Sequence, residues 1–323
     1  MARKFEVKPA EREKLKLSAM YMGATGSGKT VGALLTAKGI VEAMFPDLDN
    51  TSAEFWEKIG VVDTEHNRSK VYADATIGGH YIGKFLHLEF EPPYDVDSYI
   101  TAVNFLKDLG CEVVVIDSAT HAWDNTGGLL DLHNSLGGQF ATWQKVNPVI
   151  RKFYQALTAD TDIHIITTVR SKIKYDASQT ETGKMKVSKI GLKPIMRDDF
   201  EYEVLVALHF DEEHKVTVVK DNTQIFEGDT YLKPDYGKDL FQFLDLGIDV
   251  NYQRQLKLNK LVEELNTLVS ENRNNKEVVS LIKTVEMQAN RKYGITDWRQ
   301  LPLNSLQNVE LKLRGILDVQ ETD

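Results

Sequence analysis

The sequence predicts an α/β fold, with a mostly parallel β-sheet flanked by helices and a small C-terminal helical domain. Short β-rich runs alternate with helical stretches between Lys16 and about Leu246, as in a parallel sheet with crossover helices. Several of these runs are almost continuously apolar, which is typical of strands buried on both faces. The composition changes after residues 247–249, beyond which long helical patterns prevail. We therefore expect two domains, over residues 1–248 and 249–323.

The elements expected in the first domain follow one another in a regular order. Residues 15–22 form an expected strand before a glycine-rich segment, and the helix after that segment ends before Pro46. The next strands are the apolar runs at 58–64, 111–118 and 163–169, with helices at 96–109 and 149–157. Two later strands, at 202–210 and 214–220, are expected to form a hairpin with its turn at 211–213.

The C-terminal domain is expected to be a small helical bundle rather than a second catalytic domain. Its apolar residues fall three and four positions apart, which gives each helix one apolar face. They are Leu258, Leu261, Val262, Leu265, Leu268, Val269, then Val278, Val279, Ile282, Val285, and finally Leu306, Val309, Leu313 and Ile316. The simplest interpretation is that these faces form the core of the bundle. The alternative is that they bind another protein.

Composition limits the class of protein and of partner. The 323 residues are 42% hydrophobic and 27% charged, which is ordinary for a globular protein. No apolar run reaches the length of a membrane span, and the polar start does not suit a signal peptide. We therefore expect no membrane partner and a cytoplasmic location. A net charge of −9 argues against a general affinity for nucleic acid but allows a local basic segment.

Cysteine and histidine give little sign of a metal site. The one cysteine, Cys111, excludes an internal disulfide and has the pattern of a buried small residue. His66 and His121 lack partners at metal-ligand spacing, so no structural zinc is expected. His209 and His214 flank acidic residues and are expected to be solvated.

The glycine-rich segment G-A-T-G-S-G-K-T lies between the first expected strand and the first expected helix. In this context it is a phosphate-binding loop, because glycines let successive backbone N–H groups face phosphates at a helix N-terminus. We expect Lys29 to reach the β- and γ-phosphates and the Thr30 hydroxyl to ligate Mg²⁺. The expected nucleotide-binding residues are Gly23, Ala24, Thr25, Gly26, Ser27, Gly28, Lys29 and Thr30.

Asp117 ends the apolar run V-V-V-I-D, the position of the carboxylate that holds Mg²⁺, usually through water, in phosphate-loop ATPases. The alternative is an ordinary strand end, since this pattern is common by itself. Hydrolysis of a triphosphate also needs an acidic residue to activate the attacking water. Because Ser118 follows Asp117, that base has to come from another segment.

The segment V-V-D-T-E-H, at residues 61–66, resembles the F-I-D-A-E-H segment of the RecA recombinases. The resemblance implies that Glu65 is the water-activating base and that Tyr72 stacks on adenine, so that the nucleotide is ATP. I-I-T-T-V-R, at residues 165–170, resembles the RecA strand that senses the γ-phosphate and leads into the second DNA-binding loop. On that match Thr168 occupies the sensor position, where RecA has a glutamine.

Further segments resemble the short phage-encoded RecA-like ATPases of the Sak group. They include P-A-E-R-E-K-L-K-L, P-P-Y, H-A-W-D, F-x-x-W-x-K-V-N-P and R-D-D-F-E-Y-E, and they extend over roughly residues 5–230. The resemblance implies a RecA-like P-loop NTPase core and a DNA-dependent ATP hydrolase in the cytoplasm of a bacterial host. It also implies binding of single-stranded DNA and recombination by annealing or strand exchange, with a single-strand binding protein as a candidate partner. Trp123 and Trp143, which lie in these segments, are alternatively core residues.

Residues 170–197 carry a local excess of positive charge. The segment contains two acidic residues, Asp176 and Glu181. It contains eight basic residues: Arg170, Lys172, Lys174, Lys184, Lys186, Lys189, Lys193 and Arg197. Lysines on a loop can follow a phosphodiester backbone with little reading of the bases. We expect DNA contacts from Arg170, Lys172, Lys174, Lys184, Lys186 and Lys189, with a mobile loop at 176–184 and ordering of residues 171–190 by ATP. The alternatives are a solvated charged loop and a DNA contact in segment 123–140.

Lys220 lies where RecA-like motors often place a cation that reaches the γ-phosphate of the neighbouring subunit. That role requires a homo-oligomer, either a ring or a filament. Asn222 stands where related proteins often have a second basic residue. The function classes left open are a recombination ATPase, a replicative helicase or helicase loader, and an ATP-switched scaffold on DNA. A small-molecule kinase is disfavoured, because the sequence has no lid motif.

Overall fold

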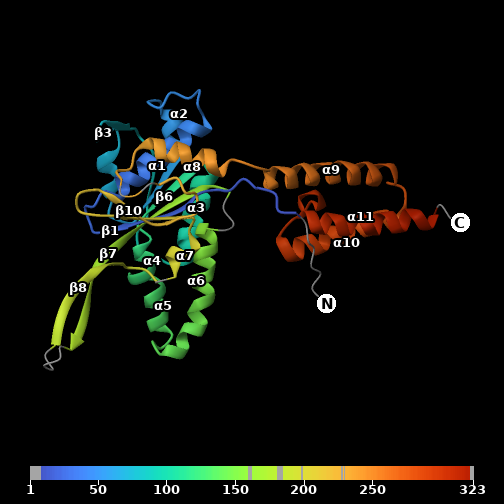
Figure 1. Cartoon of the computed structure of the whole chain (residues 1–323). Helices are drawn as coiled ribbons and strands as arrows, with labels where there is room; N and C mark the ends of the chain where they lie inside the picture. The colour runs from blue at the N-terminus through green and yellow to red at the C-terminus, as the bar shows by residue number, and fades with distance from the viewer. Residues whose placement is uncertain are drawn as a thin grey trace. The chain divides into compact units, whose positions relative to one another are not determined.

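The computed structural model describes residues 9–158, 162–179, 185–197, 199–226, 228 and 230–320, with only the backbone for residues 173–179, 185–192, 251 and 318–320. These residues form two compact units (Figure 1). One unit spans Leu15–Leu246, and the other combines residues 9–14 with the chain from Gly247 onward. No helix within the described ranges is both long enough and apolar enough to cross a membrane.

The first unit contains an eight-stranded sheet in the order β10-β9-β1-β7-β6-β2-β5, with β8 paired to β7 beside this path. Its strands are β1 (Ser18–Gly23), β2 (Ile59–Asp63), β5 (Leu86–Glu89), β6 (Val113–Asp117), β7 (His164–Gln179), β8 (Met185–Pro194), β9 (Val206–Phe210) and β10 (Val216–Asp221). Strands β9, β1, β7, β6, β2 and β5 are parallel, whereas β10 is antiparallel to β9. The mostly parallel sheet confirms the predicted fold class.

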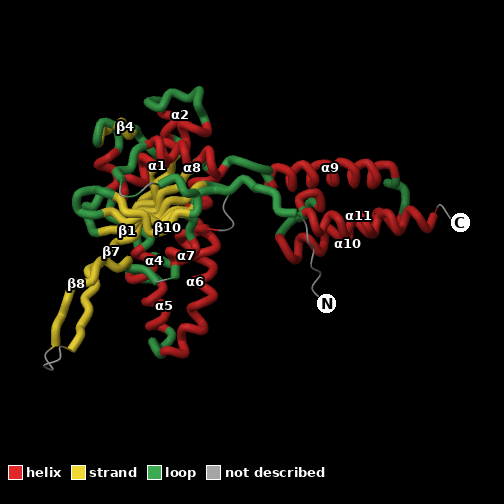
Figure 2. Tube along the Cα trace, viewed as in Figure 1, coloured by secondary structure: helices red, strands yellow, loops and turns green. Residues whose placement is uncertain are grey.

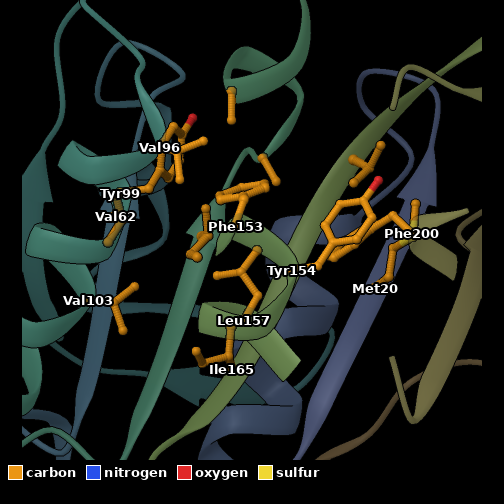
Figure 3. Close-up of a cluster of buried hydrophobic side chains, with 14 of the residues drawn as sticks. Met20, Val62, Val96, Tyr99, Val103, Phe153, Tyr154, Leu157, Ile165 and Phe200 are labelled. Carbon is orange, nitrogen blue, oxygen red and sulfur yellow. The ribbon is translucent and has the colours of Figure 1, made fainter. Parts of the chain in front are cut away.

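Helices cover both faces of this sheet (Figure 2). One face packs on α1 (Lys29–Met44) and α8 (Pro234–Leu244). The other packs on α3 (Val96–Asp108), α4 (Thr120–Asp124), α5 (Leu129–Ser135), α6 (Trp143–Thr158) and α7 (Phe200–Glu203). Figure 3 shows part of the core between the sheet and this second group of helices. There the strand residues Met20, Val62 and Ile165 and the helix residues Tyr99, Val103, Phe153 and Leu157 belong to one buried cluster. Because both faces are covered, the inner strands β2 and β6 are buried along their whole length and almost entirely apolar, as their sequences indicate.

Several short elements were not predicted. They include α2 (Ala53–Trp56), α4, α5, α7, β5, the 3₁₀ turn η1 (Arg68–Tyr72), the hairpin of β3 (Ala75–Ile77) and β4 (His80–Ile82), and the 3₁₀ turn η2 (Phe140–Thr142). Such elements are too short to give a periodic hydrophobic signal. The β9–β10 hairpin was predicted, and the Asp211 N–H donates to the Lys215 carbonyl at its turn. Its first strand was expected from residue 202 but begins at Val206, because α7 precedes it.

Strand β7 continues beyond the sheet and pairs with β8 as an antiparallel ribbon, which projects from the unit in Figures 1 and 2. The pairing runs from Ser171 opposite Pro194 to Gln179 opposite Met185. The predicted loop at 176–184 was therefore wrong for residues 176–179, whereas residues 180–184 lie outside the described residues. Serine, threonine and glycine suggested a loop, but the partner strand that satisfies the backbone lies outside the local window.

The second unit contains the helices α9 (Val250–Glu271), α10 (Lys276–Tyr293) and α11 (Leu303–Gln320), and the 3₁₀ turn η3 (Trp298–Gln300). The apolar faces of the helices form its own core, which includes Leu261, Leu265, Val278, Val285, Leu306, Val309 and Leu313. Val279 was expected on this face but is 37% exposed. Residues 9–14 group with this unit through Arg12 and Lys14, whose backbones are hydrogen-bonded to Ile248.

Candidate nucleotide site

The segment from Gly23 to Thr30 joins β1 to α1 and has the backbone of a phosphate-binding loop. Gly26 and Gly28 have φ angles of 85° and 90°, which residues with a side chain rarely adopt. A Cβ on Gly23 would lie 2.4 Å from the carbonyl oxygen of Phe210, so this position also requires glycine. No side chain caps the N-terminus of α1, which leaves the N–H groups of its first turn to face an anion.

Two polar side chains of the loop are buried in a way that fits a phosphate ligand. The Lys29 ammonium donates to the carbonyl oxygens of Gly23 at 3.0 Å and Ala24 at 2.7 Å. Burial lowers the pKa of Lys29, although Asp117 and Glu65 oppose that shift. The Ser27 hydroxyl is buried and, within the described residues, has no hydrogen-bond partner. A buried polar atom without a partner is costly, so a phosphate group that reached it would relieve that cost.

Asp117 at the end of β6 lies between two threonine hydroxyls. Thr30 donates to its Oδ2 at 2.7 Å, and Thr168 of β7 donates to its Oδ1 at 2.5 Å. The structure therefore brings Thr30 and Asp117 together, although they are 87 positions apart. Burial raises the pKa of Asp117, and the nearby carboxylates of Glu65 and Asp63 raise it further, while the two hydroxyls oppose the shift. A bound cation would stabilise this buried carboxylate.

Oxygen ligands of this kind fit Mg²⁺, which is usually held by one or two protein oxygens together with waters and substrate phosphates. Within the described ranges no group of three or more His, Cys, Asp or Glu side chains could hold a metal ion. A site made of the Thr30 hydroxyl and the Asp117 carboxylate is consistent with that finding, because it needs the nucleotide to complete it.

Glu65 follows β2 at the same edge of the sheet, since Asp63 and Asp117 are register partners in β2 and β6. Its side chain is 9% exposed, and Arg170 engages both of its carboxylate oxygens. Ser118 also donates to Oε1, at 3.2 Å. Burial by itself would raise the pKa of Glu65, but the hydrogen bonds and charge of Arg170 lower it below its ordinary value.

The comparison with protein families agrees with this geometry. The family model of an AAA domain matches residues 15–233, which is more than half of the chain. The chain belongs to the AAA domain family. No curated protein matches it. Proteins with this domain are nucleotide-binding ATPases that generally use ATP and Mg²⁺, and the chain is accordingly an AAA-type ATPase.

The turn that carries Glu65 in the AAA domain is held by Asp63. The Asp63 carboxylate accepts hydrogen bonds from the N–H groups of Glu65 and Ser69, at 2.8 and 3.0 Å, and His87 lies 3.3 Å away. His66 and Asn67, which follow Glu65, have positive φ angles of 57° and 64°. Sequence analysis missed this role of Asp63, and the only local signal was its place at a strand end.

His121 of α4 belongs to the same cluster, although no role was predicted for it. Its Nδ1 lies 2.8 Å from the Thr64 hydroxyl, its Nε2 lies 4.0 Å from Glu65 Oε1, and its ring contacts Tyr94. Burial lowers the pKa of His121, against the opposing charge of Glu65. The imidazole is therefore expected to be neutral beside the carboxylate.

Two more of the predicted nucleotide-site residues, Tyr72 and Lys220, lie on η1 and β10. Tyr72 of η1 is half-buried, and burial followed by the negative charge of Asp117 raises its pKa. Lys220 of β10 pairs with Ala207, three residues before Phe210 at the carboxyl end of β9. It therefore lies about 10 Å back from the edge that carries its own phosphate loop. Its ammonium donates to the Tyr202 carbonyl at 2.5 Å.

The predicted DNA-binding residues follow one another along the ribbon. Arg170 is the last residue of β7 in register with β1, and the exposed Lys172 pairs with Lys193. The ribbon includes three more of these lysines. In its strand pairing, Lys174 is opposite Gly191, Lys186 is opposite Ser178, and Lys189 is opposite Tyr175. Lys184 lies outside the described residues.

Other predicted features have structural roles or differ from expectation. Trp123 and Trp143 stack at 6.0 Å between ring centroids and pack against the core, which supports the core alternative. Segment 123–140 contains the end of α4 and all of α5, and its last residue, Phe140, is exposed. His209 was expected to be solvated, but its Nε2 is buried. The reason is that His209 belongs to β9, which lies between β1 and β10 in the sheet. Cys111 is buried, and burial raises the pKa of its thiol to about 11.

Proposed function

We propose that this AAA-type ATPase is a RecA-like recombination ATPase of the phage Sak type, which binds single-stranded DNA and promotes annealing or strand exchange. The observation that carries the proposal is the course of β7. Within one strand, Thr168 is hydrogen-bonded to Asp117, Arg170 engages Glu65, and the lysine-bearing ribbon begins at Ser171. A single continuous strand therefore links the candidate nucleotide site to the candidate site for a polyanion.

For hydrolysis, we assign the water-activating base to Glu65. Lys29 and the N–H groups of the loop would bind the phosphates, and Thr168 would respond to their presence through its bond to Asp117. Mg²⁺, held by Thr30 and through water by Asp117, would polarise the phosphate oxygens. Glu65 would accept the proton of the attacking water, which requires its carboxylate to be free of Arg170.

For DNA, the support is local charge rather than net charge. The protein as a whole carries −9, whereas segment 170–197 has eight basic residues against two acids. A projecting ribbon can present such charges to a flexible single strand along its length, and phosphate contacts of this kind need no base reading.

The proposal includes a homo-oligomer, ring or filament, in the cytoplasm of a bacterial host. Lys220 lies on the edge strand β10 and back from its own phosphate loop, which suits a cation supplied to a neighbouring subunit. A single-strand binding protein is a candidate partner, because such proteins occupy the same strands in cells.

The central test compares wild type with Glu65→Gln. The variant is expected to bind ATP normally and to lose about 10²–10⁴-fold in turnover, the usual contribution of a general base. Annealing and strand-exchange assays with complementary oligonucleotides should be positive for wild type. Wild-type turnover in the variant would show that the base is misassigned, and unwinding of a tailed duplex without annealing would indicate a helicase instead.

The DNA site is tested by replacing Lys184, Lys186 and Lys189 together with alanine. Each lost phosphate contact should reduce the slope of log affinity against log salt by about 0.7, so the triple variant should lose about 2. Fluorescence anisotropy of a labelled single strand across a salt series measures this. The matched control replaces the exposed Lys257, Lys283 and Lys312 of the second unit, which removes equal charge.

ATP and DNA should each tighten binding of the other by the same factor, because binding linkage is reciprocal. An unchanged salt slope in the ribbon variant, or equal DNA affinity with ADP and with a non-hydrolysable ATP analogue, would contradict this part of the proposal. Basal ATP binding should survive the triple change, since the phosphate loop is untouched.

A further inference from the structure

The contact between Arg170 and Glu65 occupies the carboxylate that hydrolysis would need. The guanidinium Nε donates to Oε1 at 2.6 Å, and Nη2 donates to Oε2. Oε1 also accepts from Ser118 at 3.2 Å, and Arg68 lies 3.9 Å from Oε2. Both oxygens of Glu65 are thus engaged by protein groups, and a bidentate guanidinium–carboxylate pair of this kind is among the stronger charge-assisted contacts.

A carboxylate in this state is a poor base for water. General-base catalysis requires the carboxylate to lie within hydrogen-bond reach of the water it activates. The side chain of Glu65 is 9% exposed, so there is little free surface at which water could replace the guanidinium. The pair also holds the pKa of Glu65 low, which weakens the carboxylate as a proton acceptor.

Arg170 sits at the junction between the sheet and the ribbon. It is the last β7 residue paired with β1, opposite Gly23, and Ser171 begins the pairing with β8. Its N–H donates to the Thr120 hydroxyl at 2.8 Å, and its carbonyl accepts from the N–H of Ile195 at 2.7 Å. The backbone is therefore held on both sides, while the side chain is 33% exposed and can change partner.

We propose that Arg170 is a latch that keeps Glu65 from water until a phosphodiester group at the base of the ribbon takes the guanidinium. The proposal rests on the assignment of Glu65 as the base and adds how that base is controlled. A phosphate matches the guanidinium fork as a carboxylate does, so one bidentate pair replaces another. Lys172, exposed two residues further along β7, would draw the polyanion to this position.

If Arg170 is a latch, removing it should raise the rate of ATP hydrolysis without DNA. Removing a purely structural ion pair would not raise that rate. Arg170→Gln should raise kcat for ATP in the absence of DNA by about tenfold, because part of the general-base contribution is released. The KM for ATP should stay unchanged, and stimulation by single-stranded DNA should fall towards none. Arg170→Lys, which keeps the charge but not the fork, should raise the DNA-free rate less.

The control is Arg197→Gln, which removes an arginine that follows β8 at the same end of the ribbon as Arg170 but pairs with Asp199 and Asn147 rather than with Glu65. Its DNA-free rate should equal that of wild type. A DNA-free rate that is unchanged or lower in both Arg170 variants, with Glu65→Gln inactive, would overturn the latch and leave the base assigned. Full activity of Glu65→Gln would overturn both. If Arg170→Gln does not fold, as judged by circular dichroism, the Arg170→Lys rate decides alone.

Discussion

Protonation of one buried histidine should make the folding of the first unit depend on pH. His164 begins β7 with 1% exposure, and its Nδ1 accepts the N–H of Leu17 at 3.0 Å. The ring is therefore neutral in the native state, with the proton on Nε2. Burial, with a smaller effect of the Lys16 charge, lowers the pKa of His164 to about 3.

The sign and size of the effect follow from linkage. The native state holds fewer protons than the unfolded state wherever the pH lies between about 3 and the unfolded pKa of about 6.5, so stability rises with pH across that window. At pH 5.5 the unfolded chain gains about 1.4 kcal/mol by protonating this histidine, whereas at pH 7.5 it gains about 0.1 kcal/mol. Lowering the pH from 7.5 to 5.5 should thus cost the fold about 1.3 kcal/mol through His164 alone.

Urea unfolding of wild type and His164→Asn, followed by tryptophan fluorescence at pH 5.5, 6.5 and 7.5, measures this term. Asparagine is the matched variant, because its Oδ1 can take the place of Nδ1 as the acceptor for Leu17 and it does not titrate. Other buried histidines titrate equally in both proteins and cancel in the difference. The stability advantage of wild type over the variant should shrink by about 1.3 kcal/mol at the lower pH. A difference that is independent of pH would refute the assignment of a neutral, low-pKa His164.

Two further perturbations have defined outcomes. Asp117→Asn should abolish turnover yet raise the unfolding free energy of the ligand-free protein at pH 7.5, because burial raises the pKa of the native carboxyl and its ionisation there costs stability. Calorimetry should also show that Mg²⁺-ATP stabilises this variant less than wild type, and a lower melting temperature without ligand would contradict the reasoning. Gly39→Ala places a Cβ 1.8 Å from the Pro234 carbonyl oxygen, where α1 and α8 touch, and should cost about 3 kcal/mol in urea unfolding. Gly315→Ala in α11 meets nothing within 4 Å and should be neutral or slightly stabilising, so equal losses in both variants would rule out a steric cause.

The sequence by itself determined the features whose physical cause is local. Glycines at positions 26 and 28 are needed for positive φ, and they precede a helix start, so the phosphate loop was readable from a few residues. Strands buried on both faces have to be apolar throughout, which made the parallel sheet and the position of Asp117 predictable. The amphipathic spacing of the last helices likewise predicted their common core.

Only the tertiary structure decided the contacts that control the site. Arg170 and Glu65 are 105 positions apart, and their pairing depends on β2 ending at the edge of the sheet where β7 leaves it for the ribbon. The ribbon was missed for the same reason, because a strand is stabilised by a partner that local composition does not reveal. Lys220 has the right chemistry for a catalytic cation, but its register opposite Ala207 sets it back from its own phosphate loop. Residue types and spacing limit which groups can react, whereas strand order and register decide which of them meet.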